Sequence, residues 1–205
     1  MEQVVEICKR NTGIRLAMVD HISSPSAIVF PIATLAQQLH KLGVLLLVDG
    51  AHAPGQVYFG KIHFTPISTS NAFQLNLDLE TLGADFYTGN LHKWCFAPRG
   101  SAFLWVAPKH RESIQPLVTS HLYKQDLTDQ FFMQGSMDQT SYLCSSAALE
   151  FYKRLGGRAA LVDYAKPLLD WAQQMLCHAL GTPVLPIPPN MQVGYCSCPA
   201  VHKLH

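Results

Sequence analysis

The feature that most constrains this 205-residue sequence is a short apolar run that ends in an acid and a glycine turn. Residues 44–48 read Val-Leu-Leu-Leu-Val, and Asp49, Gly50, Ala51 and His52 follow directly. A continuous apolar run of this length is typical of a strand in a parallel sheet that is covered on both faces. It therefore predicts a buried parallel strand with Asp49 and His52 beyond its carboxyl end, where such sheets bind ligands.

The residues before this strand complete a β-loop-α-β unit. Residues 14–19 are mostly apolar and predict a first strand, which the polar loop 20–25 follows. Residues 31–42 carry apolar side chains at helical spacing, with a proline at the start and a glycine directly after the end. Ser23 in the polar loop and Asp49 are then expected at the same edge of the sheet.

A second group of motifs surrounds a lysine. Residues 85–88 and 100–106 predict two more short strands, and the sequence Gly-Asn-Leu-His-Lys-Trp lies between them at 89–94. The glycines and the proline around Lys93 indicate a loop rather than a solvated helix face. We expect the loop to hold Lys93 in an apolar pocket, where an amine becomes a usable nucleophile.

The remaining residues divide into helices and irregular segments. Residues 1–10, 139–155 and 158–180 have apolar side chains at helical spacing and predict three further helices. Residues 57–74 have no clean period and many turn formers, so we expect a long loop or an insertion there. Residues 108–128 are polar and mixed, and are expected to cross the surface.

Composition excludes several classes of function. The net charge of +1 indicates neither a nucleic-acid nor an anionic membrane partner, and no run reaches the roughly 18 apolar residues of a membrane span. The six cysteines are scattered, and charged residues interrupt any secretory leader before Cys8. We therefore expect reduced thiols and a cytoplasmic protein. Cys196 and Cys198 precede two histidines, but this spacing matches no standard zinc pattern, so no metal site is predicted.

An acid at a strand end and a lysine on a later loop together suggest one cofactor. Pyridoxal phosphate enzymes attach the cofactor to a lysine and pair its pyridinium nitrogen with an acid. Asp49 alone could simply cap its turn, and Lys93 alone could be a solvated surface lysine. Their combination predicts a pyridoxal phosphate site, whereas a plain α/β binding domain would require both to be coincidental.

The ordered motifs resemble the class V aminotransferase family of pyridoxal phosphate enzymes, in particular the isopenicillin N epimerase-like proteins. The resemblance covers roughly residues 14–181 and rests on the segments 20–25, 48–52, 83–88, 90–94 and 97–100. It implies an α/β fold of fold type I with a mainly parallel sheet. Since family members are about twice as long, the chain resembles a truncated member. We expect a partial cofactor-binding large domain at 1–135, then a helical linker and truncated small domain at 136–205.

The resemblance also implies roles for three residues of the central motifs. Lys93 would carry the cofactor as an internal aldimine and, once released by the substrate amine, act as the base at the substrate α-carbon. Asp49 would bind the pyridine nitrogen and keep it protonated. His52 would lie close to the ring and help to set its orientation.

Further contacts to the cofactor are implied at the edges of the site. His92 and Asn90 would contact the phosphate, and Ser23 or Ser24 would lie near the ring hydroxyl. The substrate would be an amino acid or another small amine-bearing molecule. The resemblance also implies that full-length relatives are homodimers.

The reaction type stays open at this point. Epimerisation, transamination and carbon–sulfur lysis begin at the same α-carbon, and the lysis alternative would be of the cysteine-conjugate or sulfoxide lyase type. Cys95, two residues after Lys93, is expected to pack in the core rather than to act as a mobile nucleophile. An alternative of another class is a truncated, non-catalytic paralogue or a dimerisation partner.

Overall fold

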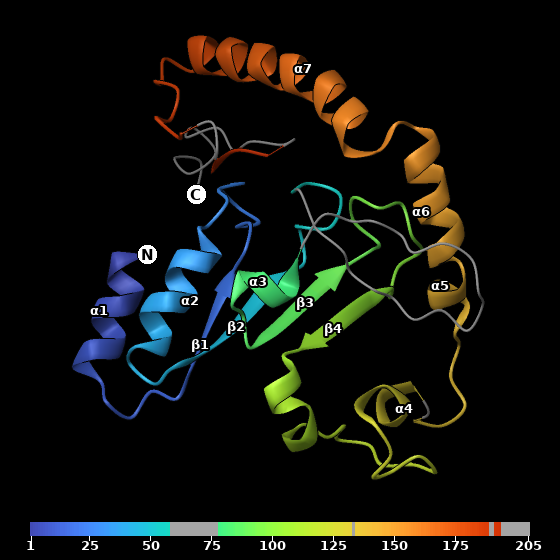
Figure 1. The fold of residues 1–205 in the computed structure, drawn as a ribbon. Coiled ribbons are helices and arrows are strands. Elements are labelled where there is room, and N and C mark those ends of the chain that lie inside the picture. The colour runs from blue at the N-terminus through green and yellow to red at the C-terminus, as the bar shows by residue number, and fades with distance from the viewer. Residues whose placement is uncertain (58–77, 133, 189–190, 194–205) are drawn as a thin grey trace.

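The computed structural model describes residues 1–57, 78–132, 134–188 and 191–193 (Figure 1). Nearly all of the expected insertion at 57–74, and the residues around Cys196, therefore lie outside the described residues. Four strands form one sheet in the order β1-β2-β3-β4, with bounds β1 (Leu16–Asp20), β2 (Leu45–Gly50), β3 (Phe86–Asn90) and β4 (Ala102–Val106). The first three strands are parallel and β4 is antiparallel to β3. The prediction of an α/β fold with a mainly parallel sheet is confirmed.

Two helices, α1 (Glu2–Arg10) and α2 (Ile32–His40), pack beside the parallel strands (Figure 1). The apolar side chains of α2 recur at helical spacing, and its Leu39 is fully buried. Leu46 and Val48, on alternate positions of β2, are also fully buried in the same core cluster. Burying one such side chain contributes about 1.5–3 kcal/mol, so this layer holds the carboxyl end of β2 in place.

The opposite face of the sheet is more open than the sequence predicts. Side chains alternate along a strand, so Leu16 and Met18 of β1 lie on the face away from the buried residues of β2. Met18 is 64% exposed, and Leu104 of β4 is 43% exposed. The expectation of a sheet covered on both faces is therefore wrong for the described residues. The continuous apolar run predicts that β2 itself is largely buried. It does not predict whether other elements cover the neighbouring strands β1 and β4.

Short helices that periodicity did not predict lie in the chain after β2, one of them before β3 and the others after β4. They are α3 (Leu79–Leu82), the 3-10 helix η1 (Pro108–Ser113) and α4 (Leu127–Phe132). Residues 108–128, expected to cross the surface, thus begin with a helical turn. Proline at the first position explains that turn, since its φ is already helical.

The helix expected at 139–155 is two helices, α5 (Thr140–Leu143) and α6 (Ser145–Arg154). The hydroxyl of Ser145 donates to the carbonyl of Ser141 at 2.9 Å, a side-chain bond that often bends helices. The long helix α7 (Gly157–Ala179) follows and arches above the sheet in Figure 1. No helix within the described ranges is long and apolar enough to cross a membrane. The division at residue 135 remains a prediction.

Candidate functional site

Asp20 and Asp49 end two neighbouring parallel strands at the same level. They are register partners of β1 and β2, so their side chains leave the same face of the sheet about 5 Å apart. The amide of His21 donates to the carbonyl of Asp49 at 2.8 Å. The Asp49 carboxylate accepts from the amide of Ala51 at 2.9 Å, which holds it in the turn after β2. The structure thus places two carboxylates at the carboxyl edge of the sheet.

A lysine and a histidine complete a charged cluster at this edge. Burial, and then the nearby charge of Asp49, raise the pKa of Asp20, while His52 and Lys93 act in the opposite direction. Burial, and then Lys93, lower the pKa of His52, against the opposing effect of both carboxylates. Such mutual effects require the four groups to lie close together. The cluster therefore contains an amine, an imidazole and two carboxylates.

Lys93 itself is exposed, so the expectation of an apolar pocket around it is wrong for the described residues. The buried side chains in its loop are instead Leu91 and Cys95, which are 6% and 0% exposed. Both pack with Ala148 and Leu149 of α6 in a second core cluster. These anchors fix the loop and leave the Lys93 amine at the surface of the cluster, within reach of a ligand.

His52 is oriented by the residue that follows the lysine. The indole N–H of Trp94 donates to Nδ1 of His52 at 3.3 Å, so a neutral His52 carries its proton on Nε2. The close approach of the turn after Asp49 to Trp94 depends on Gly55, which has a φ of 88°. A β-carbon there would lie 2.9 Å from the Trp94 carbonyl oxygen. The glycine turn after Asp49 therefore packs directly against the lysine loop (Figure 1).

Asn90 and His92, the predicted phosphate ligands, lie at and after the end of β3. Asn90 is the last residue of the strand and is half-buried. Nδ1 of His92 donates to the carbonyl of Ser101 at 2.8 Å, and that carbonyl also accepts from the amide of Leu91 at 3.0 Å. A phosphate contact from His92 would therefore have to come from Nε2. Both assignments remain predictions.

Ser23 and Ser24 lie in the turn that follows β1. The amide of Ser23 donates to the carbonyl of Ile28 at 3.0 Å, and the amide of Ala27 donates to the carbonyl of Ser23 at 2.8 Å. Ser23 is half-buried and Ser24 is exposed. Their predicted proximity to a ring hydroxyl remains a prediction.

The sequence motifs gave no role to Asp20, although its carboxylate belongs to the charged cluster. A signal was present, because Asp20 and Asp49 each follow a valine at the end of an apolar strand. Only the parallel register shows that the two strand ends coincide. The sequence motifs also gave no role to His21 and Tyr87. These two buried residues are 66 positions apart in the sequence and form a hydrogen bond in the structure.

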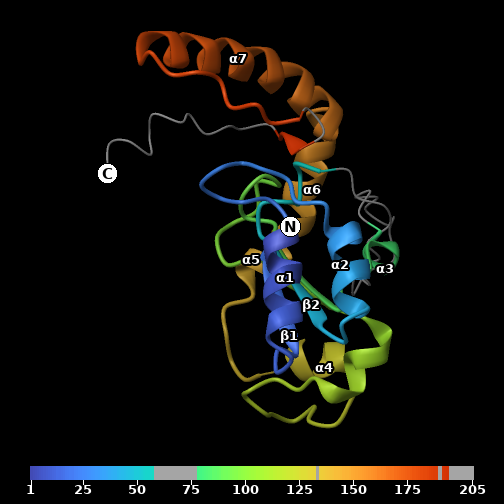
Figure 2. The ribbon, with the colours of Figure 1, turned by 90° about the vertical axis from the view of Figure 1, so that its left-hand side faces the viewer.

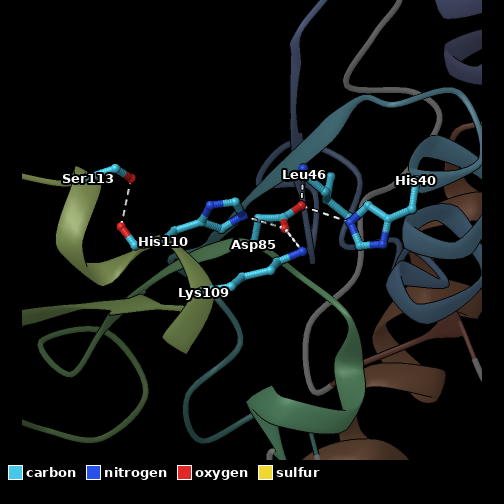
Figure 3. A network of polar contacts seen from close by, with 6 residues as sticks. All are labelled: His40, Leu46, Asp85, Lys109, His110 and Ser113. Carbon is cyan, nitrogen blue, oxygen red and sulfur yellow. Dashed lines mark hydrogen bonds and ion pairs between the residues drawn. The ribbon is translucent and has the colours of Figure 1, made fainter.

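A separate polar network surrounds the fully buried carboxylate of Asp85 (Figure 3). Its oxygens lie 2.7 Å from Nζ of Lys109, 2.8 Å from Nε2 of His40 and 2.9 Å from Nε2 of His110. The Leu46 amide donates to it at 2.8 Å. Burial alone would raise the pKa of Asp85, but these hydrogen bonds outweigh burial and hold it well below the usual range. Asp85 precedes β3, so the network lies at the opposite end of that strand from the candidate site.

Comparisons with known proteins agree with the motifs. No family model matches the chain. It is 32% identical to a probable L-cysteine desulfhydrase, chloroplastic, from Arabidopsis thaliana, over 87% of this chain and 34% of that protein. It is 28% identical to an isopenicillin N epimerase from Streptomyces clavuligerus, over 88% of this chain and 45% of that protein. The chain thus spans less than half the length of these relatives.

A solved structure supports the fold. The apo structure of a cysteine desulfurase from Thermococcus onnurineus NA1 superimposes with a TM-score of 0.64 at 15% identity, covering 93% of this chain and 45% of that one. At this identity the match supports the fold alone. The ordered motifs and the two sequence matches show that the chain is a relative, over most of its own length, of the class V aminotransferase family of pyridoxal phosphate-dependent enzymes.

Proposed function

We propose that this chain carries the lysine, the ring-binding acid and part of the surrounding site of a pyridoxal phosphate-dependent enzyme that acts on an amino acid. The observation that supports this most directly is the hydrogen bond from Trp94, next to Lys93, to His52, which joins the lysine loop to the turn after Asp49 at the end of β2. Asp49 belongs to β2, and His52 and Lys93 come from two loops more than 40 positions apart in the sequence. Their convergence is the arrangement that the family resemblance requires.

The donor set fits the cofactor. The Asp49 carboxylate, fixed by the Ala51 amide, suits the pyridinium nitrogen, and the exposed amine of Lys93 suits the aldehyde carbon. Asn90 and His92 would hold the phosphate. When bound, the cofactor supplies an electron sink for negative charge at the substrate α-carbon.

The protein's own residues would then have distinct tasks. Asp49 would keep the ring nitrogen protonated, because a carboxylate favours the charged form of its partner. His52, whose pKa is lowered by burial and Lys93, would present a neutral imidazole oriented by Trp94. The Lys93 amine would take and return the proton at the substrate α-carbon.

Two reactions remain candidates for the whole protein. Epimerisation or transamination is the first, in line with the match to an isopenicillin N epimerase. Carbon–sulfur lysis is the second, and the matches to L-cysteine desulfhydrases favour it. For the second reaction, burial raises the pKa of the Cys95 thiol to about 12, so Cys95 is poorly suited to accept sulfur as a thiolate. The sulfur would leave as sulfide without a protein thiol from that loop.

The first experiment is cofactor retention by the purified chain. After addition of pyridoxal phosphate and dialysis, the visible spectrum is recorded, and borohydride treatment followed by peptide mass spectrometry locates the attached cofactor. We expect attachment at Lys93, none in Lys93→Ala, and unchanged attachment in Lys124→Ala, which removes an exposed lysine far along the chain. Release of sulfide from L-cysteine, against inversion or amino transfer of other amino acids, then separates the two reactions.

A folded chain that retains no cofactor would overturn the proposal for the isolated chain. The same measurement on a mixture with a full-length relative then tests the alternative of a non-catalytic paralogue or dimerisation partner. In that case the relative's cofactor content or oligomeric state, rather than attachment at Lys93, would change.

A further inference from the structure

We propose that His21 and Tyr87 are positioning residues for Asp49, forming a hydrogen-bonded bridge across the end of β2. The positioning role is a property of this chain's fold. Its consequence for catalysis rests on the proposed function, since it is Asp49 that would pair with the cofactor ring. Neither residue was singled out by the sequence, and neither belongs to the charged cluster itself.

The bridge joins the two strands that flank β2. His21 directly follows β1 and Tyr87 lies in β3, and Nδ1 of His21 lies 2.8 Å from the phenolic oxygen of Tyr87. The two rings meet edge to face with centroids 5.9 Å apart. Both side chains are buried, with His21 7% and Tyr87 0% exposed. Because β2 lies between β1 and β3, this hydrogen bond passes over β2.

The crossing point is the residue after Asp49. A β-carbon on Gly50 would lie 2.2 Å from the ring and hydroxyl of Tyr87, so Tyr87 occupies the place of a side chain at that position. The amide of His21 also donates to the Asp49 carbonyl at 2.8 Å. One member of the bridge therefore holds the backbone of Asp49, and the other covers Gly50. Tyr87 is the register partner of Val48, so the bridge lies on the face opposite to the Asp49 side chain and acts on that carboxylate through the backbone of residues 49 and 50.

The bridge is uncharged around neutral pH. Burial lowers the pKa of His21 to about 4, and burial, followed by the charge of Asp49, raises the pKa of Tyr87 well above its ordinary value. Because His21 and Tyr87 are both neutral, neither of them neutralises the negative charge of Asp49. That charge stays available for a cation on the ligand side of the sheet edge.

Amide exchange in the cofactor-free chain tests the positioning role. The Ala51 amide donates to the Asp49 carboxylate, so its hydrogen exchange reports whether that carboxylate is in place. Tyr87→Phe keeps the ring, which stacks on Phe103, and removes only the hydroxyl. We expect Ala51 exchange to become faster by about tenfold, the effect of losing one net hydrogen bond.

An internal reference separates this effect from general loosening. The Leu46 amide, on the same strand, donates to the Asp85 carboxylate and should keep its exchange rate in Tyr87→Phe. Tyr152→Phe is the matched control, because Tyr152 is also buried and its hydroxyl donates to the carbonyl of Gly55. Unchanged exchange at Ala51, or equal acceleration at Ala51 and Leu46, would overturn the proposal.

The cofactor-loaded chain provides a second readout. In Tyr87→Phe, the pH at which the visible spectrum of the bound cofactor changes should move in the same direction as in Asp49→Asn, by a smaller amount. A loaded chain in which Tyr87→Phe leaves that pH unchanged would contradict positioning through Asp49. If the wild-type chain retains no cofactor, the proposed function fails, whereas the exchange measurement still decides the role of the bridge.

Discussion

The carboxylates of Asp20 and Asp49 leave the same face of the sheet from register partners on adjacent parallel strands. Two like charges in this arrangement repel each other, and the Lys93 amine, together with His52 when it is protonated, offsets that repulsion. The charge state of each group at this edge therefore depends on the others. This coupling allows a test that needs neither cofactor nor substrate.

Replacing Asp20 with Asn should lower the pKa of His52 further. Asp20 is one of two carboxylates that favour the imidazolium form of His52, so its removal strengthens the net effect of burial and Lys93. The measurement is an NMR titration of the His52 ring protons in the two proteins. Asp126→Asn, which changes an exposed carboxylate elsewhere, serves as the control. A His52 titration that does not move would show that Asp20 lies too far away to act on it.

Replacing Asp85 with Asn should destabilise the chain by about 2–4 kcal/mol, because it removes a buried carboxylate with several charge-assisted hydrogen bonds. The measurement is the free energy of unfolding in urea. Asp163→Asn, an exposed change on α7, should alter it by less than about 0.5 kcal/mol.

The lowered pKa of Asp85 also predicts that the chain loses stability in acid. The folded pKa of Asp85 lies below its ordinary value of 3.8, so its contribution is fully present above that pH and is lost as pH falls below it. The Asp85→Asn protein should lack this part of the acid transition. Identical slopes of stability against pH below 4 in both proteins would contradict the role assigned to the network.

The lowered pKa of His21 predicts that the stability of the chain also changes with pH over a second, separate range. Its pKa is about 4 in the folded chain against an ordinary 6.5, so the unfolded state binds the proton more readily between these values. Stability should fall by about 3 kcal/mol as pH decreases from about 6.5 to about 4. Unfolding in urea across this range tests it, with His121→Gln as the control at an exposed histidine. His21→Gln should flatten the dependence, and a slope retained in that variant would assign it to another group.

Cys95 should be the least reactive thiol among those the structure describes. It is fully buried and burial raises its pKa to about 12, whereas Cys144 is half-buried. Brief treatment of the native chain with a disulfide reagent, followed by peptide mass spectrometry, should label Cys144 well before Cys95. Rapid labelling of Cys95 in the folded chain would show that its loop opens, and would return a sulfur-accepting role to consideration.

Local pattern determined the elements that frame the site. The apolar run at 44–48 predicted β2, and the helical spacing at 31–42 and 158–180 predicted α2 and α7. These patterns succeed because strand and helix periodicities are properties of neighbouring residues. The ordered motifs around Asp49 and Lys93 likewise indicated the family, since they depend on residue type and order alone.

Tertiary structure decided how those elements meet. The partnership of Asp20 with Asp49 requires the register of two strands, and the bridge between His21 and Tyr87 requires β1 and β3 to flank β2. The exposure of Lys93 follows from its buried neighbours, which pack on a helix about 50 residues later. No local period carries such information, because register and long-range packing are set by the whole core at once. The sequence by itself determined which chemical groups the site contains, and the fold alone decided which of them lie together.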